Sequence, residues 1–210
     1  MNKEYLEQIN DFIHLEEGST VLEIAGGVGP LVDIINKSRI KKYIFVEPNE
    51  TWLTNCRNER HYNCETEWHC KVYEDYEPAE KIDTLICCGL VYHLLSPCHF
   101  FEKVANVYKP ETFYLEMSGH WTKDYPDVYN PESIPTVFMP EKINVGGMRY
   151  SSDKRVIPYH ILLNKDFVVH AMDTIGYKLE KFNNIVSDHR SKDRVVIFKF
   201  NRYDPTISST

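Results

Sequence analysis

The chain has 210 residues, of which 42% are hydrophobic and 13% aromatic, and a formal net charge of -7. This length suits one domain with a sizeable core, and the composition is far from that of disordered chains. The acidic balance disfavours a nucleic-acid partner, because phosphate binding relies on clustered Lys and Arg. No N-terminal run combines basic residues with an apolar core, and no apolar run reaches the roughly 20 residues that span a bilayer. We therefore expect a cytoplasmic protein without a membrane segment.

Hydrophobic patterns divide the chain into alternating helices and strands. Gly18 stops the first helix, Pro30 suits the first turn of the second, and Asn49 is placed to cap the third. Such alternation predicts one α/β domain over residues 1–202, built on a doubly wound, mostly parallel sheet. The expected order is helix 2–18, strand 20–25, helix 30–37, strand 41–48, helix 49–61, strand 67–76, strand 82–94, helix 96–110, strand 112–117, helix 163–176 and strands 177–185 and 194–202.

One long segment breaks this alternation. Residues 118–163 carry five prolines and the Gly146–Gly147 pair, and they show no clear periodicity. A segment of that length in a compact domain is usually a functional lid or binding insert, so we expect it to cover a substrate site. Residues 203–210 are expected to form a loose tail.

The cysteines raise the question of a zinc site, because all six lie in one stretch that also holds His61 and His69. There is no C-x-x-C pair, and Cys87 and Cys88 are neighbours in an expected strand, where their side chains point to opposite faces. We therefore expect no metal and interpret the cysteines as free thiols in a reducing compartment. They are Cys56, Cys64, Cys70, Cys87, Cys88 and Cys98.

The junction STVLEIAGGVGPLVDIINKS, residues 19–38, predicts a ligand site. Its glycines let a ligand approach the backbone at the carboxyl end of the first strand, which suits a nucleotide-like molecule. A pyrophosphate dinucleotide would favour G-x-G-x-x-G, but aligning Gly27 and Gly29 with its first two glycines puts Val32 at the third. A nicotinamide-dependent oxidoreductase is therefore the weaker alternative.

Two acidic residues lie around this turn. Glu47 ends the second strand, about 20 residues beyond the glycines, where a carboxylate can accept hydrogen bonds from both ribose hydroxyls. Glu23 lies inside the first strand, under the turn, where a carboxylate could reach a ligand's ammonium group directly or through water. Together they favour an amino-acid-bearing nucleoside over a pyrophosphate.

Three segments, VLEIAGGVGPL, YIFVEPN and KIDTLICCGLVYHLLSP, resemble in this order the motifs of class I S-adenosylmethionine-dependent methyltransferases. The resemblance covers residues 19–117, and the two terminal strands agree with the reversed seventh strand of that superfamily. It implies a Rossmann-like, seven-stranded, mostly parallel sheet with a reversed last strand and helices on both faces. It also implies S-adenosylmethionine as cofactor and S-adenosylhomocysteine as product. Ala25 stands where that motif usually has a glycine.

The resemblance also implies which residues bind the cofactor. Glu47 would bind the ribose hydroxyls, Pro48 and Asn49 would flank the adenine, and Asp75 or Glu74 would hold the adenine amino group. The residues implied along the methionine and ribose are Ala25, Gly26, Gly27 and Gly29 from the turn, and Cys88, Gly89 and Leu90 from the end of the fourth strand.

Methyl transfer from a sulfonium is an in-line displacement, so an enzyme gains most by aligning the acceptor with the methyl carbon. If the acceptor is a hydroxyl, a neutral His could take its proton, and His93 is the best placed candidate. His120 and Trp121, which follow the fifth strand, form a second candidate group. Aromatic residues of the insert that could cover the pocket are Tyr150, Tyr159 and His160.

We predict a methyltransferase that acts on a small-molecule acceptor at oxygen or nitrogen, with oxygen somewhat preferred. A non-catalytic binding or partner protein of the same fold stays open as an alternative. So does a transfer-RNA-modifying methyl- or carboxymethyltransferase, because GLVYHLLSP resembles part of the enzymes that modify wobble uridines. Leu94 and Leu95 replace the basic residues of those enzymes, which favours the small-molecule acceptor.

Overall fold

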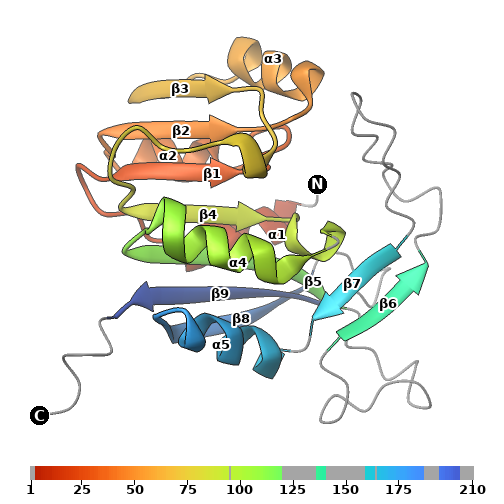
Figure 1. Ribbon diagram of the computed structural model, residues 1–210. Coiled ribbons are helices and arrows are strands. Elements are labelled where there is room, and N and C mark those ends of the chain that lie inside the picture. The colour runs from red at the N-terminus through yellow and green to blue at the C-terminus, as the bar shows by residue number, and fades with distance from the viewer. Residues whose placement is uncertain are drawn as a thin grey trace, which may run out of the picture.

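The computed structural model describes residues 3–94, 96–119, 136–140, 159–163, 165–186 and 194–203. Its main sheet has seven strands in the order β3-β2-β1-β4-β5-β9-β8, and a second sheet pairs β6 with β7 (Figure 1). The strands are β1 (Thr20–Ile24), β2 (Lys42–Val46), β3 (Glu65–His69), β4 (Thr84–Cys88), β5 (Thr112–Gly119), β6 (Thr136–Pro140), β7 (Tyr159–Leu163), β8 (Tyr177–Val186) and β9 (Arg194–Arg202).

Strand directions in the main sheet confirm the predicted fold. Strands β1 to β5 pair in parallel, whereas β9 runs antiparallel to both β5 and β8. The last strand of the chain is therefore the reversed one. All carboxyl ends of β1 to β5 consequently meet at one edge of the sheet, on the right in Figure 1. In α/β sheets this is the edge where ligands bind.

Helices cover both faces of the main sheet. Figure 1 shows α4 and α5 in front of the sheet and α1 and α2 behind it. Two hydrophobic clusters follow this division: Leu22 of β1 packs with the α4 and α5 side, and its neighbour Val21 packs with the α1, α2 and α3 side. The helices are α1 (Lys3–Phe12), α2 (Val32–Lys37), α3 (Glu50–Glu59), α4 (Pro97–Lys103) and α5 (Lys165–Thr174), with short turns η1 (Tyr73–Asp75), η2 (Val91–His93) and η3 (Val104–Tyr108).

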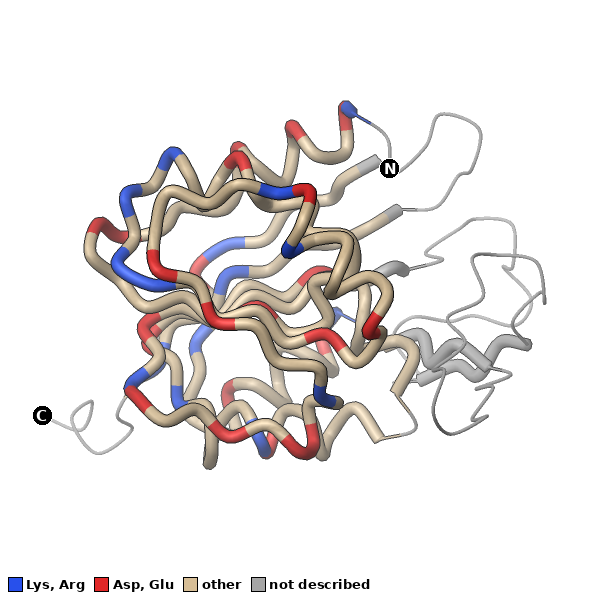
Figure 2. The backbone as a smooth tube through the Cα atoms, turned by 90° about the horizontal axis from the view of Figure 1, so that it is seen from above, with Lys and Arg blue, Asp and Glu red and all other residues tan. Residues whose placement is uncertain are grey.

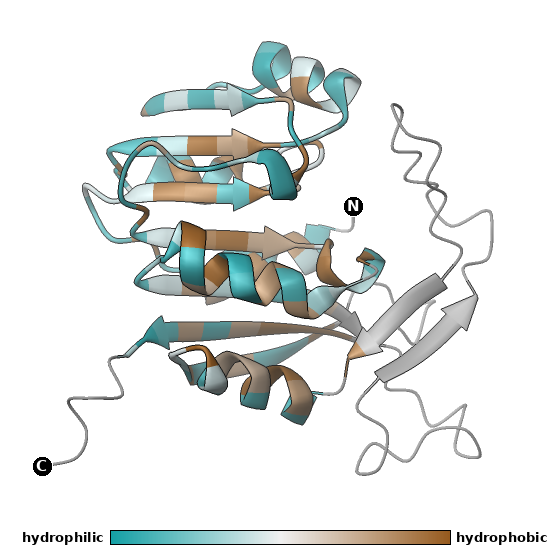
Figure 3. Ribbon diagram, viewed as in Figure 1, coloured by the Kyte–Doolittle hydropathy of each residue, from teal (hydrophilic) through white to brown (hydrophobic). Residues whose placement is uncertain are grey.

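Burial explains which strands are central. All residues of β1 and β2 are buried, whereas every residue of β3 is exposed or half-buried. Figure 3 shows hydrophobic residues concentrated in β1, β2 and β4 and a more hydrophilic β3 at the edge. A parallel strand covered on both faces needs a continuous apolar run, and an edge strand does not.

Several sequence predictions are confirmed in detail. Asn49 caps α3, since its side chain accepts a hydrogen bond from the backbone N–H of Trp52 over 3.1 Å. Cys87 and Cys88 pack on opposite faces of the sheet. Gly176 follows α5 with a φ of 88°, a value that suits a helix stop at glycine.

Other elements differ from the predictions. The expected strand 67–76 is β3 at Glu65–His69, followed by the 3-10 turn η1, and α2 begins at Val32, after Pro30 rather than around it. The segment 118–163, for which no regular structure was expected, contains the end of β5 and both strands of the β6–β7 sheet. Strand β7 contacts η2 and β5. The expected tail lies outside the described residues, apart from Tyr203.

Charged residues are spread over the described chain. Figure 2 shows Lys and Arg positions interspersed with Asp and Glu along the backbone. Of the helices within the described ranges, none is long and apolar enough to cross a bilayer.

Candidate functional site

The turn between β1 and α2 has an unusual backbone. Ala25, Gly27 and Gly29 have φ values of 58°, 58° and 67°, in the left-handed region that favours glycine. Ala25 therefore adopts a left-handed conformation although it has a Cβ, at the position where the methyltransferase motif usually has a glycine. At Gly27, a Cβ would meet no described atom within 4 Å, so the space beside this backbone is open.

Close packing explains why Gly26 and Gly29 carry no side chain. A Cβ at Gly26 would lie 2.3 Å from a ring carbon of Phe45 and 3.0 Å from the Glu23 carboxyl carbon. A Cβ at Gly29 would lie 2.3 Å from the sulfur of Cys56. The turn thus rests directly on β1, β2 and α3, which fixes the position of its exposed side.

Glu47 connects the turn to the end of β2. Its side chain is 3% exposed, and its two carboxylate oxygens accept hydrogen bonds from the backbone N–H groups of Gly27, over 3.0 Å, and Asn49, over 2.9 Å. Burial raises the pKa of Glu47, and the two N–H groups act in the opposite direction. The sequence predicts Glu47 near the glycines, and in the structure its carboxylate accepts a hydrogen bond from one of them, Gly27.

Glu23 lies beneath the same turn. Its side chain is 1% exposed, and the carboxylate accepts a hydrogen bond from the Tyr43 hydroxyl. Burial raises the pKa of Glu23 to about 7; the Tyr43 hydrogen bond lowers it, and the nearby Glu47 charge raises it. A Cβ at Gly26 would lie 3.0 Å from the Glu23 carboxyl carbon, so this carboxylate lies directly against the turn. Its contact with a ligand, directly or through water, stays a prediction.

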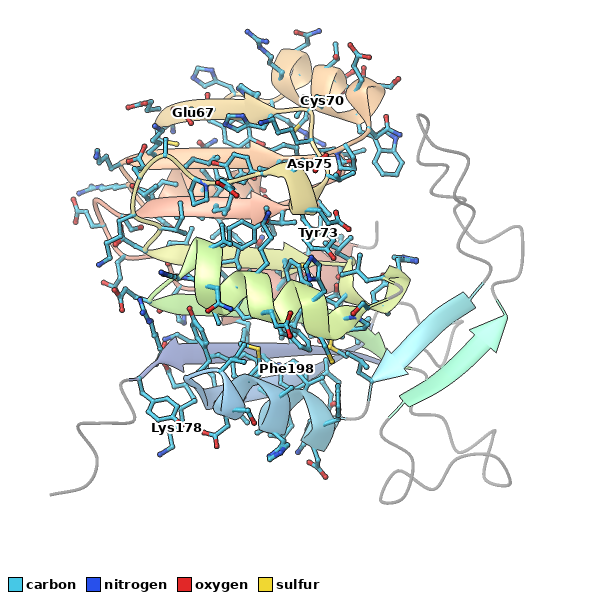
Figure 4. All side chains as sticks on the ribbon, viewed as in Figure 1. Glu67, Cys70, Tyr73, Asp75, Lys178 and Phe198 are labelled. Atoms are coloured by element: carbon cyan, nitrogen blue, oxygen red, sulfur yellow. The ribbon has the colours of Figure 1, made fainter. Side chains whose placement is uncertain are left out.

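The turn η1 brings Asp75 to the carboxyl-end side of the strands, where Figure 4 labels it beside Tyr73. Asp75 is exposed, and so is Glu74. Two contacts hold the turn: the Lys103 ammonium donates to the Glu74 carbonyl, and the Tyr108 hydroxyl donates to the Tyr73 carbonyl over 2.7 Å. The backbone is therefore fixed, and both acidic side chains stay available.

The end of β4 supplies the next part of the edge. Gly89 has a φ of 78° and turns the chain from Cys88 into η2. In η2 the rings of Tyr92 and His93 lie 4.3 Å apart, centroid to centroid. Both side chains are half-buried, and β7 packs on this turn.

The structure adds one carboxylate that the sequence analysis did not single out. Glu116 of β5 pairs with Cys88 of β4 and is 3% exposed. Burial raises the pKa of Glu116 to about 7, and the Gly89 N–H and the Tyr5 hydroxyl act in the opposite direction. The sequence signal that could have identified Glu116 is an acidic residue inside a mostly apolar strand. Glu23 was selected on the same signal.

Some predicted site residues cannot be placed. His120, Trp121 and Tyr150 lie outside the described residues, and only the backbone of Tyr159 and His160 is described, in β7. The six cysteines are free thiols. In the described ranges no group of His, Cys, Asp and Glu is arranged to hold a metal ion.

A cavity of about 650 Å³ lies elsewhere, lined by residues that include Glu111, Gly176 and Arg202. Glu111 precedes β5, Gly176 precedes β8, and Arg202 ends the reversed strand β9. The cavity is therefore at the amino ends of the parallel strands, opposite the edge that carries the glycine turn.

Comparison with known proteins agrees with this geometry. A family model described as a methyltransferase domain matches residues 1–152. No curated protein matches the sequence.

Solved structures share the fold. A protein from Listeria monocytogenes, assigned as an S-adenosylmethionine-dependent methyltransferase, superimposes with a TM-score of 0.69 at 11% identity, covering 95% of this chain and 99% of that one. The 1,6-didemethyltoxoflavin-N1-methyltransferase of Burkholderia thailandensis gives 0.68 at 8% identity, covering 97% and 80%. A methyltransferase from Clostridium acetobutylicum ATCC 824, also S-adenosylmethionine-dependent, gives 0.61 at 10% identity, covering 96% and 92%.

The matched family model spans most of the chain, and the seven-stranded sheet has the reversed last strand that the sequence motifs implied. The chain therefore belongs to the methyltransferase-domain family, and its fold is that of the class I S-adenosylmethionine-dependent methyltransferases.

Proposed function

We propose that the protein is an enzyme that transfers a methyl group from S-adenosylmethionine to a small-molecule acceptor. The observation that carries this proposal is the Glu47 carboxylate, which is buried at the end of β2 and bonded to the Gly27 N–H of the turn. It brings a hydrogen-bond acceptor and an open glycine backbone to one place, as an adenosine ligand requires.

The residues at the turn fit this cofactor. A carboxylate offers about four lone-pair positions, and Glu47 uses one on each oxygen for backbone N–H groups. The remaining positions suit the two ribose hydroxyls. The open space beside Gly27 suits close approach of the ligand, and exposed Asp75 is available for the adenine amino group.

When bound, S-adenosylmethionine supplies an electrophilic methyl group on a sulfonium. The protein's contribution is to hold and orient the two reactants. Glu47 would fix the ribose, with Pro48 and Asn49 beside the adenine, and the backbone of Ala25 and Gly26 would follow the methionine. Gly89 and its neighbours Cys88 and Leu90 would contact the same portion from the end of β4. Alignment of acceptor and methyl carbon within about 3 to 3.5 Å is the main source of rate in such a displacement.

The acceptor would lie over the carboxyl ends of β4 and β5, between the cofactor and the segment 118–163. The packing of β7 on η2 supports this position, because η2 directly follows β4. His93 of η2 remains a candidate base for a hydroxyl acceptor, beside the ring of Tyr92. A role for His120 also stays a prediction.

The free thiols of all six cysteines support a reducing, cytoplasmic location. The continuous main sheet, which takes its last strands from residues 177–202, supports one catalytic domain over residues 1–202 with 118–163 as its lid. Along the described backbone, charges are interspersed rather than gathered in a basic stripe, which supports a small-molecule substrate over a nucleic acid.

Calorimetric titration with S-adenosylmethionine, S-adenosylhomocysteine and NAD tests the cofactor. We expect dissociation constants in the micromolar range, about -8 kcal/mol, for the first two and no heat for NAD. Release of S-adenosylhomocysteine in the presence of an acceptor then tests turnover. Absence of binding contradicts the proposal, and binding without turnover on any acceptor supports the non-catalytic alternative.

A further inference from the structure

Glu116 lies beside the proposed cofactor site, but none of the proposed cofactor contacts involves its carboxylate. Glu116 pairs with Cys88, so it lies beside the last residue of β4 and three residues before β5 ends. A Cβ added at Gly89 would lie 3.9 Å from a Glu116 carboxylate oxygen and 3.5 Å from the Tyr92 hydroxyl. Glu116 thus borders the backbone that would contact the methionine portion of the cofactor.

The surroundings of Glu116 contain no positive charge among the residues that the structure describes. The titratable groups that influence it or feel its charge are Tyr5 of α1 and Cys87 and Cys88 of β4. None of them is a cation, and no ion pair joins Glu116 to a described Lys or Arg. Burying an uncompensated carboxylate destabilises a fold, and a glutamine would fill the same space without that cost.

We propose that Glu116 is the acceptor-binding carboxylate of this site and that the acceptor is a basic amine whose nitrogen lies against it. The inference rests on the proposed methyl transfer and names its substrate class. Tyr5 is a positioning residue: its hydroxyl, from α1, and the Gly89 N–H, which follows β4, both favour the charged form of the carboxylate and lower the pKa of Glu116. Two donors leave about two lone-pair positions free for the N–H groups of a ligand.

The chemistry of nitrogen suits this carboxylate better than that of an alcohol. An ammonium ion brings the positive charge that the described surroundings of Glu116 lack, and its proton is far more acidic than that of an alcohol, so the carboxylate can accept it as the nitrogen reacts. The proton moves from nitrogen to a Glu116 oxygen, and the freed lone pair forms the N–C bond. The C–S bond breaks with its electron pair on sulfur, so the products are an N-methylammonium and a neutral thioether. Protonated Glu116 returns its proton to solvent when the products leave.

The test compares amines with alcohols of the same skeleton: butylamine with 1-butanol, 2-phenylethylamine with 2-phenylethanol, and glucosamine with glucose. Binding to the protein saturated with S-adenosylhomocysteine is measured by calorimetry, and turnover is measured as S-adenosylhomocysteine release from S-adenosylmethionine. We expect at least one amine to bind about tenfold or more tightly than its alcohol and to be the methylated member of its pair.

Glu116→Gln keeps the shape and removes the charge. It is expected to lower kcat/KM for the amine by about a hundredfold or more, with affinity for S-adenosylmethionine changed less than about twofold. The matched control is Glu111→Gln, since Glu111 is 51% exposed and lies at the other end of the same strand. It should leave both quantities unchanged.

Tyr5→Phe supplies a second test, which holds even if Glu116→Gln fails to fold. The Tyr5 hydrogen bond lowers the pKa of Glu116, so its loss should raise that pKa. The acidic limb of the pH profile for amine kcat/KM should therefore shift to higher pH. An unshifted limb overturns the assignment.

The other outcomes also decide the matter. Equal use of alcohols, retention of amine turnover in Glu116→Gln, or no amine binding by a protein that binds the cofactor each overturns the proposal. If Glu116→Gln weakens S-adenosylmethionine but not S-adenosylhomocysteine, the carboxylate faces the sulfonium and the amine assignment is wrong. Failure of the wild type to bind either cofactor form contradicts the proposed function instead.

Discussion

The Glu47 carboxylate accepts a hydrogen bond from the backbone N–H of Gly27 over 3.0 Å, and this contact joins the end of β2 to the turn after β1. The same carboxylate also accepts a hydrogen bond from the backbone N–H of Asn49. One buried side chain therefore fixes the relative position of two segments that the proposed cofactor would bridge.

Replacing Glu47 with Ala should weaken S-adenosylmethionine binding by about 1 to 3 kcal/mol, because charge-assisted hydrogen bonds to the ribose are lost. Calorimetry on the folded variant measures this directly. Glu50→Ala is the matched control, since Glu50 lies in the first turn of α3 and is exposed. Equal affinity of wild type and Glu47→Ala would remove Glu47 from the site.

Replacing Gly29 with Ala should destabilise the fold by about 2 to 4 kcal/mol. The new Cβ would meet the Cys56 sulfur at 2.3 Å, and a φ of 67° adds backbone strain. Adding Cys56→Ala should recover the part of the loss that comes from the Cys56 clash. It should leave about 1 kcal/mol of backbone strain and the 3.0 Å contact of the new Cβ with the Tyr62 hydroxyl. Urea unfolding of the single and double variants provides the comparison, and additive losses would show that no clash exists.

Replacing Ala25 with Gly should stabilise the protein by about 0.5 kcal/mol. Glycine relieves the strain of a φ of 58°, and this gain exceeds the entropy that glycine adds to the unfolded chain. Ala171→Gly in α5 is the control of opposite sign, with an expected loss of about 0.5 to 1 kcal/mol. Chemical unfolding measures both, and a loss of stability in Ala25→Gly would contradict the argument.

Stability should fall as the pH rises from about 4.5 to about 7. Burial raises the pKa of Glu116 from 4.5 to about 7, and of Glu23 likewise. In this window the folded state binds more protons than the unfolded state, so deprotonation favours unfolding. Ionisation of each carboxyl should lower the free energy of unfolding by on the order of 3 kcal/mol above pH 7.

Urea unfolding of the wild type and Glu116→Gln at pH 5 and pH 8 isolates one of these contributions. The variant should lose less stability between the two pH values, whereas Glu111→Gln should follow the wild type. Parallel pH profiles for wild type and Glu116→Gln would show that Glu116 is ionised normally in the folded protein.

The sequence predicted the main sheet because its signals are local. Continuous apolar runs mark β1, β2 and β4, and the glycine turn and the cap at Asn49 mark the junctions between strand and helix. The position of Glu47 was predictable for the same reason, since it follows a strand at a fixed distance from the glycines. Its hydrogen bond to Gly27 was not, because that contact depends on how two strands pair.

Non-local pairing also explains what was missed. Strands β6 and β7 pair although 18 residues separate them in the chain. The proline-containing segment that holds them has no alternation of hydrophobic residues that would predict a strand. Glu116 lies within an apolar strand, and its closeness to Tyr5 and Gly89 depends on the packing of α1 and the end of β4. A single sequence therefore shows that residue 116 is a glutamate, but not which residues pack around it.

A crystal structure of the protein with S-adenosylhomocysteine would test the proposed site most directly. We expect the ribose hydroxyls on the Glu47 carboxylate, the methionine portion between the glycine turn and Gly89, and the sulfur directed toward the side of Glu116. Ligand density at the opposite end of the sheet, in the cavity beside Glu111 and Arg202, would contradict it.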